Sequence, residues 1–345
     1  LDVSLKLAHR YIEDANAPIT VRSSLDRREM LPGSDAVVTT VGVGDHEAWK
    51  TDIVLPRQFG IYQWTGDTYG PGGVSRCLRM IPVMVEIAHD IAELAPDALF
   101  VNCANPMSAI MRAMHRETKA RPIGLCSGTG ATHARLAQAI GVPKDDLWME
   151  ATGVNHFTWI LNLRLNGQDA WPLVREKAGP GSRNDGSLEW EMFDIFGGYP
   201  CPGDMHFSEF LPAWLGKNAY YGQTVGMLEW ADSEKWVAYI DQQYDLMVDV
   251  AYGKAPLQKT EKLDDEQIIE ILDAYWMDRR KHYAINMPNA GQVANLPQGA
   301  ILEGTTLVGA TGFRPLSYGN IPAGIAALLA HVIAVQELTV DAALA

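Results

Sequence analysis

Two hydrophobic periodicities alternate along the first half of this chain. Residues 78–94 and 107–118 place apolar side chains at every third or fourth position, which predicts amphipathic helices, whereas residues 98–103 and 147–154 are short apolar runs that predict strands. The same criteria predict helices at residues 4–14, 26–31 and 132–140, and strands at residues 1–2 (the tail of one), 19–23, 35–43, 123–126 and 157–165. Strands that alternate with helices are typical of a parallel, helix-covered sheet of the doubly wound (Rossmann-like) α/β class.

The rhythm changes after the Asn166-Gly167 turn. We expect a Gly-, Ser-, Asn- and Asp-rich loop at residues 179–187, long helices at 233–251 and 264–276, a strand at 300–308 and a closing apolar helix at 321–334. We therefore place a soft boundary after residue 166. Residues 1–166 form the α/β domain, and residues 167–345 form a second, α+β domain.

The chain begins part of the way into such a fold. A doubly wound dinucleotide-binding domain normally opens with a strand, a glycine-rich phosphate loop and a helix. That first unit is absent from the start of this sequence, and Asp2 stands close to the place where an acidic residue would meet the adenosine ribose. Either the chain is a fragment, or it does not bind a dinucleotide.

Composition narrows the class of protein. The 345 residues are 47% hydrophobic and 20% charged, as in ordinary globular proteins, and suffice for one large or two medium domains. A formal net charge of −14 makes nucleic acid and anionic membranes poor partners. Four cysteines in so long a chain do not form a disulfide framework, so we expect reduced thiols and a cytoplasmic location. We find no sufficiently long apolar run and expect no membrane-spanning segment.

Cys126 and His156 are the most suggestive pair of side chains. Each follows a predicted strand, and ligands collect beyond the carboxyl ends of the strands in an open α/β sheet. A thiolate and an imidazole together suit a borderline metal such as zinc, manganese or iron. The plain alternative is that Cys126 is a small buried hydrophobic residue and His156 a satisfied core residue, and spacing alone favours that alternative.

Further polar clusters lie at strand ends or sharp turns. The glycine-rich loop at residues 66–73 could hold an anion or a sugar hydroxyl through its backbone N–H groups, although a plain turn explains the motif better. Asn105 precedes a helix and Asp204 lies in a Gly/Pro corner, so each could simply cap a helix. Asn286 and Asn289 are amides in an apolar region; such groups need partners, which a bound sugar could supply.

Six blocks of the sequence, in this order, resemble glycoside hydrolase family 4, the NAD- and manganese-dependent glycosidases. They are GDTYGPGGVSRCLR (residues 66–79), NCANP (102–106), GLC (124–126), GVNHFTW (153–159), DMHFSEFLP (204–212) and NMPNAGQVANLP (286–297). The resemblance extends roughly from residue 4 to the end of the chain. The first and fifth blocks are more similar to the α-galacturonidases, α-galactosidases and α-glucosidases of the family than to its phosphoglycosidases.

The resemblance implies a redox-assisted elimination without net oxidation, which is an exception to the usual two-carboxylate hydrolysis of glycosides. The nicotinamide of NAD accepts the hydride from C3 of the sugar, and the resulting ketone acidifies the hydrogen at C2. A base removes that proton, the group at C1 leaves, water adds at C1 and the hydride returns to C3. A divalent metal on the C2 and C3 oxygens acts as a Lewis acid.

The resemblance also implies roles for individual residues. Cys126 and His156 would ligate Mn²⁺, and Asp204 would be the base at C2. The residues implied to hold the sugar are Asn105, Asn155, Ser127, Asn286 and Asn289, and those implied to lie at the NAD are Asp2, Val41, Gly42, Val43, Asp67, Asn102 and Asn105. Residues 1–166 would then be the NAD-binding domain. Residues 167–345 would form a substrate and oligomerisation domain with the C-terminal fold of lactate and malate dehydrogenases.

Departures from the family pattern leave alternatives open. Ser127 follows the ligand Cys126 where many relatives have His, and both ends of the chain are expected to be incomplete. The activity that the resemblance implies is hydrolysis of a non-phosphorylated α-glycoside by a homodimer or homotetramer. A simple NAD-dependent dehydrogenase of the lactate/malate dehydrogenase superfamily and a non-catalytic sugar-binding relative are the two alternatives.

Overall fold

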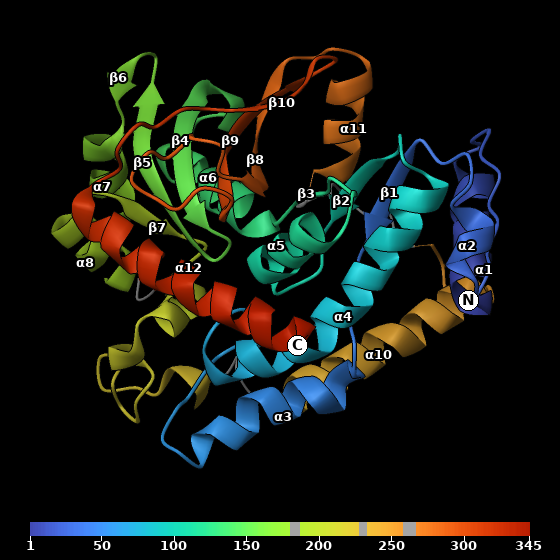
Figure 1. Ribbon diagram of the computed structural model, residues 1–345, viewed down its shortest axis with the longest axis horizontal. Coiled ribbons are helices and arrows are strands. Elements are labelled where there is room, and N and C mark those ends of the chain that lie inside the picture. Colours follow the sequence, from blue (N-terminus) through green and yellow to red (C-terminus); the bar gives the residue numbers. More distant parts are fainter. Residues whose placement is uncertain (180–186, 228–232, 258–266) are drawn as a thin grey trace.

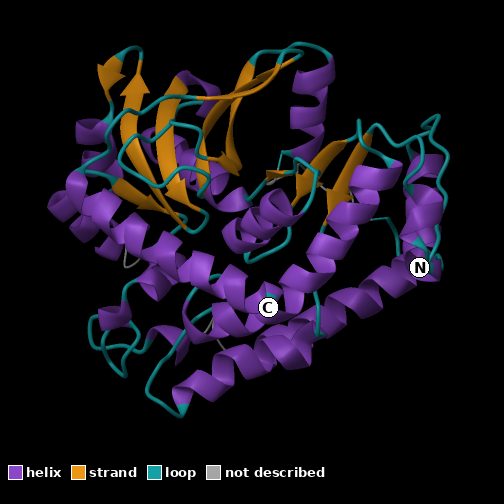
Figure 2. Cartoon of the chain, viewed as in Figure 1, coloured by secondary structure: helices purple, strands orange, loops and turns teal. Residues whose placement is uncertain are grey.

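The computed structural model describes residues 1–179, 187–227, 233–257 and 267–345, whose strands join in one helix-covered sheet (Figures 1 and 2). The strand order is β1-β2-β3-β8-β9-β4-β5-β6, with β10 beside β9 and β7 beside β5. The strands are β1 (Ala36–Thr39), β2 (Leu99–Asn102), β3 (Ile123–Gly124), β4 (Leu147–Val154), β5 (Phe157–Leu165), β6 (Gln168–Asp169), β7 (Tyr199–Cys201), β8 (Lys281–Pro288), β9 (Ile301–Gly309) and β10 (Gly312–Pro315).

The predicted parallel sheet is correct for one end of the observed sheet and wrong for the rest. β1, β2 and β3 pair in parallel, whereas β3 with β8, β8 with β9, β9 with β4 and β4 with β5 are antiparallel. β4 and β5 are antiparallel because the connection between them is short: it consists of Asn155 and His156 alone. Two residues can join antiparallel strands, whereas parallel strands need a crossover of about a dozen residues or more.

β8 and β9 lie late in the chain but at the centre of the sheet, between β3 and β4. The sequence analysis found β9 and missed β8. Strands from both sides of residue 166 share one sheet. The domain boundary at that residue stays a prediction. The architecture is a mixed α/β sheet in which a parallel portion continues into antiparallel hairpins.

Most predicted helices are present, with shifted ends. The helices are α1 (Asp2–Asp14), α2 (Arg27–Met30), α3 (Asp45–Arg57), α4 (Gly70–Leu94), α5 (Met107–Glu117), α6 (Ser127–Ile140), α7 (Trp171–Ala178), α8 (Ser187–Phe196), α9 (Asp204–Phe207), α10 (Ser233–Ala251), α11 (Ile268–Trp276) and α12 (Ala323–Leu344). The strands predicted at residues 1–2 and 19–23 are wrong, because Asp2 begins α1 and residues 19–23 have no regular structure. Parts of the predicted loop at 179–187 and of the helix at 264–276 lie outside the described residues.

The first helix packs on a helix from the second half of the chain. Arg10 of α1 donates to the backbone oxygen of Val250, and Tyr252 donates to the carboxylate of Asp2. Figure 1 accordingly shows the N-terminus beside α10. Asp2 therefore lies on a helix and not at the end of a strand, where the sequence analysis expected it.

Methionine-rich packing holds α4 against α5 and α12. Met80 and Met84 of α4 are fully buried, as are Met107, Met111 and Met114 of α5, and Val340 of α12 belongs to the same cluster. Each such side chain contributes about 1.5–3 kcal/mol of transfer free energy when fully buried. This packing fixes the N-terminal end of α5, which Asn105 precedes.

The absence of a long apolar segment is a further expectation that the structure corrects. α12 is, by length and composition alone, long and apolar enough to cross a membrane, and 44% of its most apolar window is buried in the molecule. Its buried residues, including Leu329, Val332 and Ile333, belong to the hydrophobic core, and it lies beside α4 and α5 (Figure 1). Such burial is typical of a core helix.

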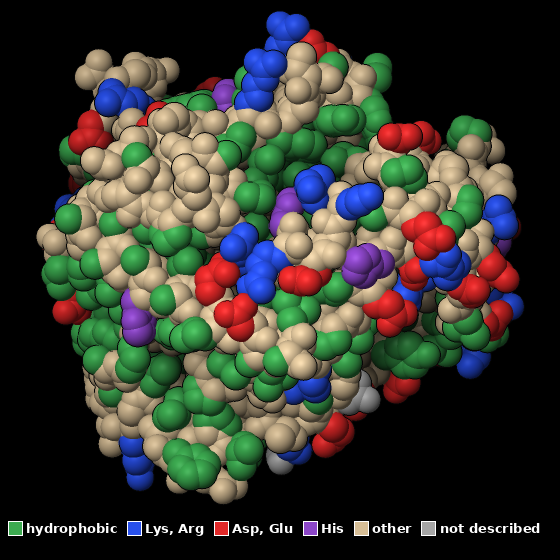
Figure 3. All heavy atoms as spheres, in the orientation of Figure 1, with side chains coloured by type: hydrophobic (Ala, Val, Ile, Leu, Met, Phe, Trp, Pro, Cys, Tyr) green, Lys and Arg blue, Asp and Glu red, His purple; other side chains and the backbone are tan. Residues whose placement is uncertain are grey.

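Ion pairs tie α12 to α5 at the surface. Arg112 and Arg116 of α5 pair with Glu337 and Asp341 of α12 at 2.6 and 2.7 Å. Figure 3 shows acidic and basic side chains next to one another on this face of the molecule. Partly exposed pairs near a surface are each worth about 1 kcal/mol, so the buried methionine packing dominates this contact.

A row of buried residues, most of them polar, crosses the sheet at one level, and we call it the polar row. Successive partners in register from β1 to β7 are Thr39, Asn102, Gly124, Asn286, Glu303, Gly153, Thr158 and Cys201. Residues directly opposite one another in neighbouring strands point to the same face, so these side chains share one face of the sheet. A Cβ on Gly124 would lie 2.5 Å from Met107 Sδ, so α5 packs closely against this face.

Candidate functional site

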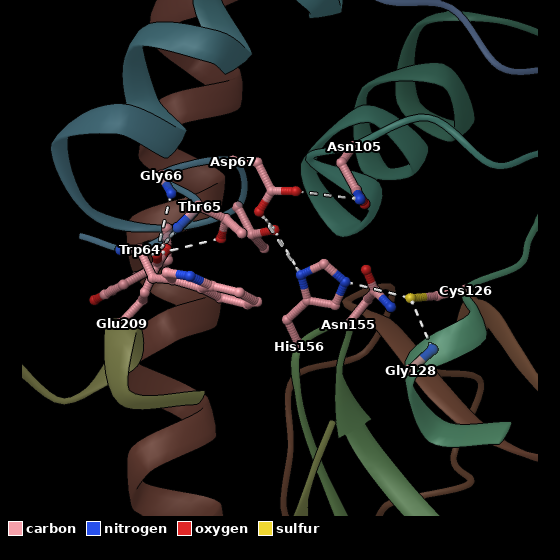
Figure 4. Close-up of polar contacts among 12 residues, drawn as sticks. Trp64, Thr65, Gly66, Asp67, Asn105, Cys126, Gly128, Asn155, His156 and Glu209 are labelled. Atoms are coloured by element: carbon pink, nitrogen blue, oxygen red, sulfur yellow. Dashed lines mark hydrogen bonds and ion pairs between the residues drawn. The ribbon is translucent and has the colours of Figure 1, made fainter. Parts of the chain in front are cut away.

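Cys126 and His156 meet beyond the carboxyl end of β3. Cys126 is the N-cap of α6, where its Sγ accepts the N–H of Gly128 at 3.5 Å. His156 stands in the two-residue turn between β4 and β5 and brings its Nε2 to 3.3 Å from the Cys126 Sγ (Figure 4). The structure thus brings together the two predicted metal ligands.

The surroundings of His156 are negatively charged. The imidazole is buried, and its Nδ1 lies 2.8 Å from Thr68 Oγ1 and 3.9 Å from Asp67 Oδ1. Burial by itself would lower the pKa of His156, but Cys126, Asp67 and Glu303 together raise it to about 9. The same potential that holds a proton on this ring would attract a cation.

The pair fits a divalent metal in distance and in chemistry. Metal–sulfur and metal–nitrogen bonds of about 2.3 and 2.1 Å, at tetrahedral or octahedral angles, put the two ligand atoms roughly 3.1–3.6 Å apart. Among the described residues, no group of three or more His, Cys, Asp or Glu side chains could hold a metal ion. A metal on Cys126 and His156 would therefore take its other ligands from substrate or water, as open catalytic sites do.

His156 has a strained backbone. Its φ is 151°, in a region that side-chain-bearing residues rarely adopt, and its N–H donates to the Val154 oxygen at 2.7 Å across the turn. Such conformations cost about 1–3 kcal/mol and concentrate at functional sites. The strain is offset by the hairpin that surrounds the turn, and it aims the imidazole at Cys126.

Asp67 links the glycine-rich loop to His156. Its Oδ1 accepts from Thr68 Oγ1 at 2.8 Å, and the Asn105 amide lies 3.5 Å from its Oδ2. Burial alone would raise the pKa of Asp67, but His156, His206, the Thr68 hydroxyl and Arg76 together outweigh burial and hold the pKa below its usual value. Asp67 is therefore an ionised carboxylate directly beside the Cys126–His156 pair.

Glu209 holds residues 64–66, the segment directly before Asp67, through hydrogen bonds. Its Oε1 accepts from the backbone N–H groups of Trp64, Thr65 and Gly66 at 2.7, 2.6 and 3.0 Å (Figure 4). The Gln63 amide lies 3.3 Å from the other carboxylate oxygen. A fully buried carboxylate is costly unless its lone pairs are satisfied, and three converging N–H donors satisfy it here.

A cavity of about 640 Å³ opens next to these residues. Gly42, Val43 and Asp67, three of the residues predicted at the cofactor, are in its lining, together with residues that the sequence analysis did not select: His46, Trp49, Trp64, Thr65, Arg76, Arg79 and His206. Val41 is partly buried and packs on the core beneath it. This cavity lies beyond the carboxyl ends of the parallel strands, where α/β folds bind ligands.

A second cavity, of about 690 Å³, lies at the other end of these strands. Its lining includes Leu99 and Ile123, the first residues of β2 and β3, and Trp276 of α11. Neither Cys126 nor His156 is in its lining.

Four buried side-chain oxygens near the pair have no hydrogen-bond donor within the described part of the chain, and we call them the unpaired acceptors. They are Asn105 Oδ1, Asn155 Oδ1, Asn286 Oδ1 and Glu303 Oε1. Asn155 precedes His156, and Asn286 donates to the oxygen of Gly124, two residues before Cys126. Because buried polar atoms normally have partners, these oxygens point to a ligand that supplies donors.

Two other predicted amides are already satisfied by the protein. Asn102 accepts from Thr39 and donates to the Ala104 oxygen, both at 3.0 Å. Asn289 donates to the oxygens of Val293, Leu296 and Pro297 and accepts two backbone N–H groups, so it organises the loop that follows β8. Protein groups thus hold both side chains, and the roles of Asn102 at the cofactor and Asn289 at the sugar stay predictions.

Asp204 caps α8, a helix that precedes it in the chain. Its carboxylate accepts the N–H groups of Leu188 and Glu189 at 3.0 and 2.8 Å, at the start of α8, and the Tyr220 hydroxyl at 2.5 Å. Burial raises its pKa, and the Tyr220 hydrogen bond opposes that rise. Three of about four acceptor positions of the carboxylate are thus occupied, and one on Oδ1 is left.

Ser127 begins α6 directly after Cys126 and is half-buried. Glu209 and Glu303 are the important residues that sequence reasoning missed. Glu209 lies inside the DMHFSEFLP block, and Glu303 interrupts an apolar strand, ILEGTTLVG. A lone carboxylate within a buried strand needs hydrogen-bond partners, and this requirement could have marked Glu303 as a functional candidate from the sequence.

The fold and the site together define an α/β protein in which a cysteine–histidine pair lies beyond the carboxyl end of a strand, at a separation that fits a divalent metal. The model of family 4 glycosyl hydrolases matches residues 1–142, and the model of the C-terminal domain of the same family matches residues 151–345. The chain belongs to glycosyl hydrolase family 4 and is a glycoside hydrolase, as the six sequence blocks predicted.

Characterised relatives lie near 30% identity. An α-galactosidase of Bacillus subtilis (strain 168) is 29% identical over 334 residues, which are 95% of this chain and 76% of that protein. An α-galacturonidase of the same organism is 30% identical over 342 residues, 92% of this chain and 75% of that protein. An α-glucosidase of Erwinia rhapontici is 28% identical, with 100% of this chain and 82% of that protein covered.

Solved structures share the fold. The Thermotoga maritima 6-phospho-β-glucosidase, solved with manganese, NAD⁺ and glucose-6-phosphate, matches with a TM-score of 0.82 at 18% identity, over 99% of this chain and 79% of that one. Malate dehydrogenase from Plasmodium falciparum matches with a TM-score of 0.56 at 11% identity, over 97% of this chain and 84% of that one. The expected likeness to the malate dehydrogenase fold is therefore confirmed.

Proposed function

We propose that this glycosidase hydrolyses a non-phosphorylated α-glycoside, an α-galacturonide, α-galactoside or α-glucoside, and that it uses NAD and a divalent metal ion. The observation that carries the proposal is the set of unpaired acceptors around Cys126 and His156. A sugar presents several hydroxyl donors within a small volume, which is what buried acceptors without donors require. The names of the relatives near 30% identity support the α-glycoside class.

In this proposal NAD, when bound, would take up and return the C3 hydride, and the metal would polarise the C2 and C3 oxygens. Cys126 and His156 would hold the metal. Gly42, Val43 and Asp67 would face the nicotinamide end of NAD, since all three line the cavity. The side chains that would accept sugar hydroxyls are Asn105, Asn155 and Asn286, and Ser127 would stand beside the substrate. A cytoplasmic location and a homodimer or homotetramer stay predictions.

The test is cleavage of a small panel of aryl α-glycosides with and without NAD⁺, Mn²⁺ and reductant, in deuterated water. The proposal expects cleavage that needs all three additives, deuterium at C2 of the product and no net NADH. Cleavage that is indifferent to NAD⁺ would contradict the redox mechanism. Net NADH accumulation without cleavage would identify a dehydrogenase, the runner-up that the likeness to malate dehydrogenase favours.

Asp204 would be the base that removes the C2 proton. Its raised pKa gives the carboxylate basicity, and its remaining Oδ1 position could take the proton. Asp204→Asn is expected to abolish C2 exchange. It should also destabilise the fold by about 1–2 kcal/mol, because the new amide nitrogen cannot accept an N–H from α8.

Tyr220→Phe is the companion variant. The Tyr220 hydroxyl lowers the pKa of Asp204, so its removal raises that pKa further. A base must be deprotonated to act, so the acidic limb of the rate profile should move to higher pH in Tyr220→Phe. An unmoved acidic limb, or normal exchange in Asp204→Asn, would leave Asp204 as a helix cap only.

A further inference from the structure

Glu303 is the most deeply buried charge in the polar row. It is 1% exposed, and its register partners are Asn286 on β8 and Gly153 on β4. Its Oε2 accepts from Asn155 Nδ2 at 3.1 Å and from Thr158 Oγ1 at 2.9 Å. Its Oε1 is one of the unpaired acceptors.

Asn155 stands between this carboxylate and the metal ligand. Its side chain is fully buried, its backbone N–H donates to Ser108 Oγ at 3.3 Å, and it directly precedes His156. An amide can be rotated by half a turn at little steric cost, so its neighbours decide which end faces where. Only the nitrogen end of Asn155 can meet the carboxylate of Glu303, and this leaves the Oδ1 end without a donor.

We propose that Glu303 is a positioning residue, which holds the Asn155 amide with its oxygen available to accept a hydroxyl of the bound sugar. The inference rests on the proposed function, because it takes the sugar as the donor that Asn155 Oδ1 lacks. The geometry explains why a carboxylate stands in the middle of an apolar strand. An aliphatic residue there would leave the Asn155 nitrogen unpaired in the core, and a neutral amide there would permit both orientations of Asn155.

Glu303→Gln is the decisive variant. Glutamine keeps the shape of glutamate but can both donate and accept, so it no longer fixes the orientation of the Asn155 amide. We measure kcat and KM for the aryl α-glycoside that the wild type cleaves fastest, with saturating NAD⁺ and Mn²⁺. We also measure calorimetric binding of the free monosaccharide, galactose or galacturonic acid. We expect KM and the monosaccharide Kd to rise about 10-fold or more, since an acceptor is lost from the sugar site. The Kd of NAD⁺ should change less than about twofold.

Thr158→Val is the matched control. It removes the other donor to the same Oε2 atom but leaves the Asn155 contact in place. It should lower Tm and leave KM within about twofold of wild type. Equal KM increases in Thr158→Val and Glu303→Gln would mean a purely structural role for Glu303 and would overturn the inference.

A reciprocal pair keeps the test decisive if Glu303→Gln folds poorly. In Asn155→Asp combined with Glu303→Gln, the new Gln nitrogen can donate to the new Asp, whose second oxygen still faces the sugar. The pair should bind the monosaccharide several-fold more tightly than Glu303→Gln alone. Failure to recover, with a normal Tm, would contradict the positioning role. A wild type that neither cleaves nor binds any sugar would instead refute the proposed function, a distinct result.

Discussion

Glu209→Ala is expected to lower kcat by about 100-fold or more, because it frees the segment that places Asp67. The backbone N–H groups of Trp64, Thr65 and Gly66 all converge on one oxygen of Glu209. Each buried N–H left without an acceptor costs about 1–3 kcal/mol, so the segment should rearrange until water reaches it. Asp67, the next residue, would then lose its position beside His156.

Glu209→Gln is the informative partner of this variant. Its amide oxygen can still accept the three N–H groups, although without the strength of a charged acceptor, so kcat should fall less than in Glu209→Ala. Glu191→Ala is the control, because the Glu191 carboxylate is exposed and accepts from Tyr221 alone among the contacts described. Steady-state kinetics with urea unfolding of all three variants tests the prediction. A folded Glu209→Ala enzyme with normal kcat would contradict it.

His156→Gly should abolish metal binding yet give a more stable protein than His156→Ala. The backbone at His156 has a φ of 151°, which glycine adopts freely and alanine does not. Both variants lose the imidazole and differ by a single methyl group, so the difference between them reports mainly on the backbone. Relief of strain should raise the free energy of unfolding of the Gly variant by about 1–3 kcal/mol relative to the Ala variant. At most other positions alanine is the more stabilising of the two residues.

The functional half of this prediction concerns the metal. Loss of a ligand that supports several kcal/mol of transition-state stabilisation should lower kcat/KM by about 1,000-fold or more in both variants. Mn²⁺ titration by calorimetry and thermal unfolding of the pair give the two readouts. Equal stabilities of the Gly and Ala variants would show that the turn relaxes, and undiminished Mn²⁺ affinity would remove His156 from the metal site.

The sequence analysis placed Cys126 and His156 together, but part of its argument does not apply to the observed fold. The rule about the carboxyl ends of parallel strands applies to Cys126, which follows β3. His156 lies instead in the turn of an antiparallel hairpin. The predicted strands end at residue 154 and begin again at residue 157, so the sequence already indicated a two-residue turn. The six family blocks, which depend on residue identity and not on topology, led to the correct family.

The contacts that sequence reasoning missed are those between distant segments. Glu209 meets residues about 145 positions earlier, and Glu303 meets Asn155 across the pairing of β9 with β4. Local periodicity predicts which face of a strand is buried but carries no information about which strand lies beside it. Asn289 shows the converse: an amide in an apolar region was interpreted as a sugar contact, and the backbone of its own loop satisfies its hydrogen bonds.

The central position of β8 and β9 also governs how this protein can be made. During synthesis β1, β2 and β3 emerge long before the strands that complete their sheet, and at about 5–20 residues per second the wait is on the order of ten seconds or more. Throughout that time β3 presents an unpaired, apolar edge to other nascent chains. β1, β2 and β3 can therefore join the observed sheet only after residues 281–309 have been synthesised and have left the ribosome.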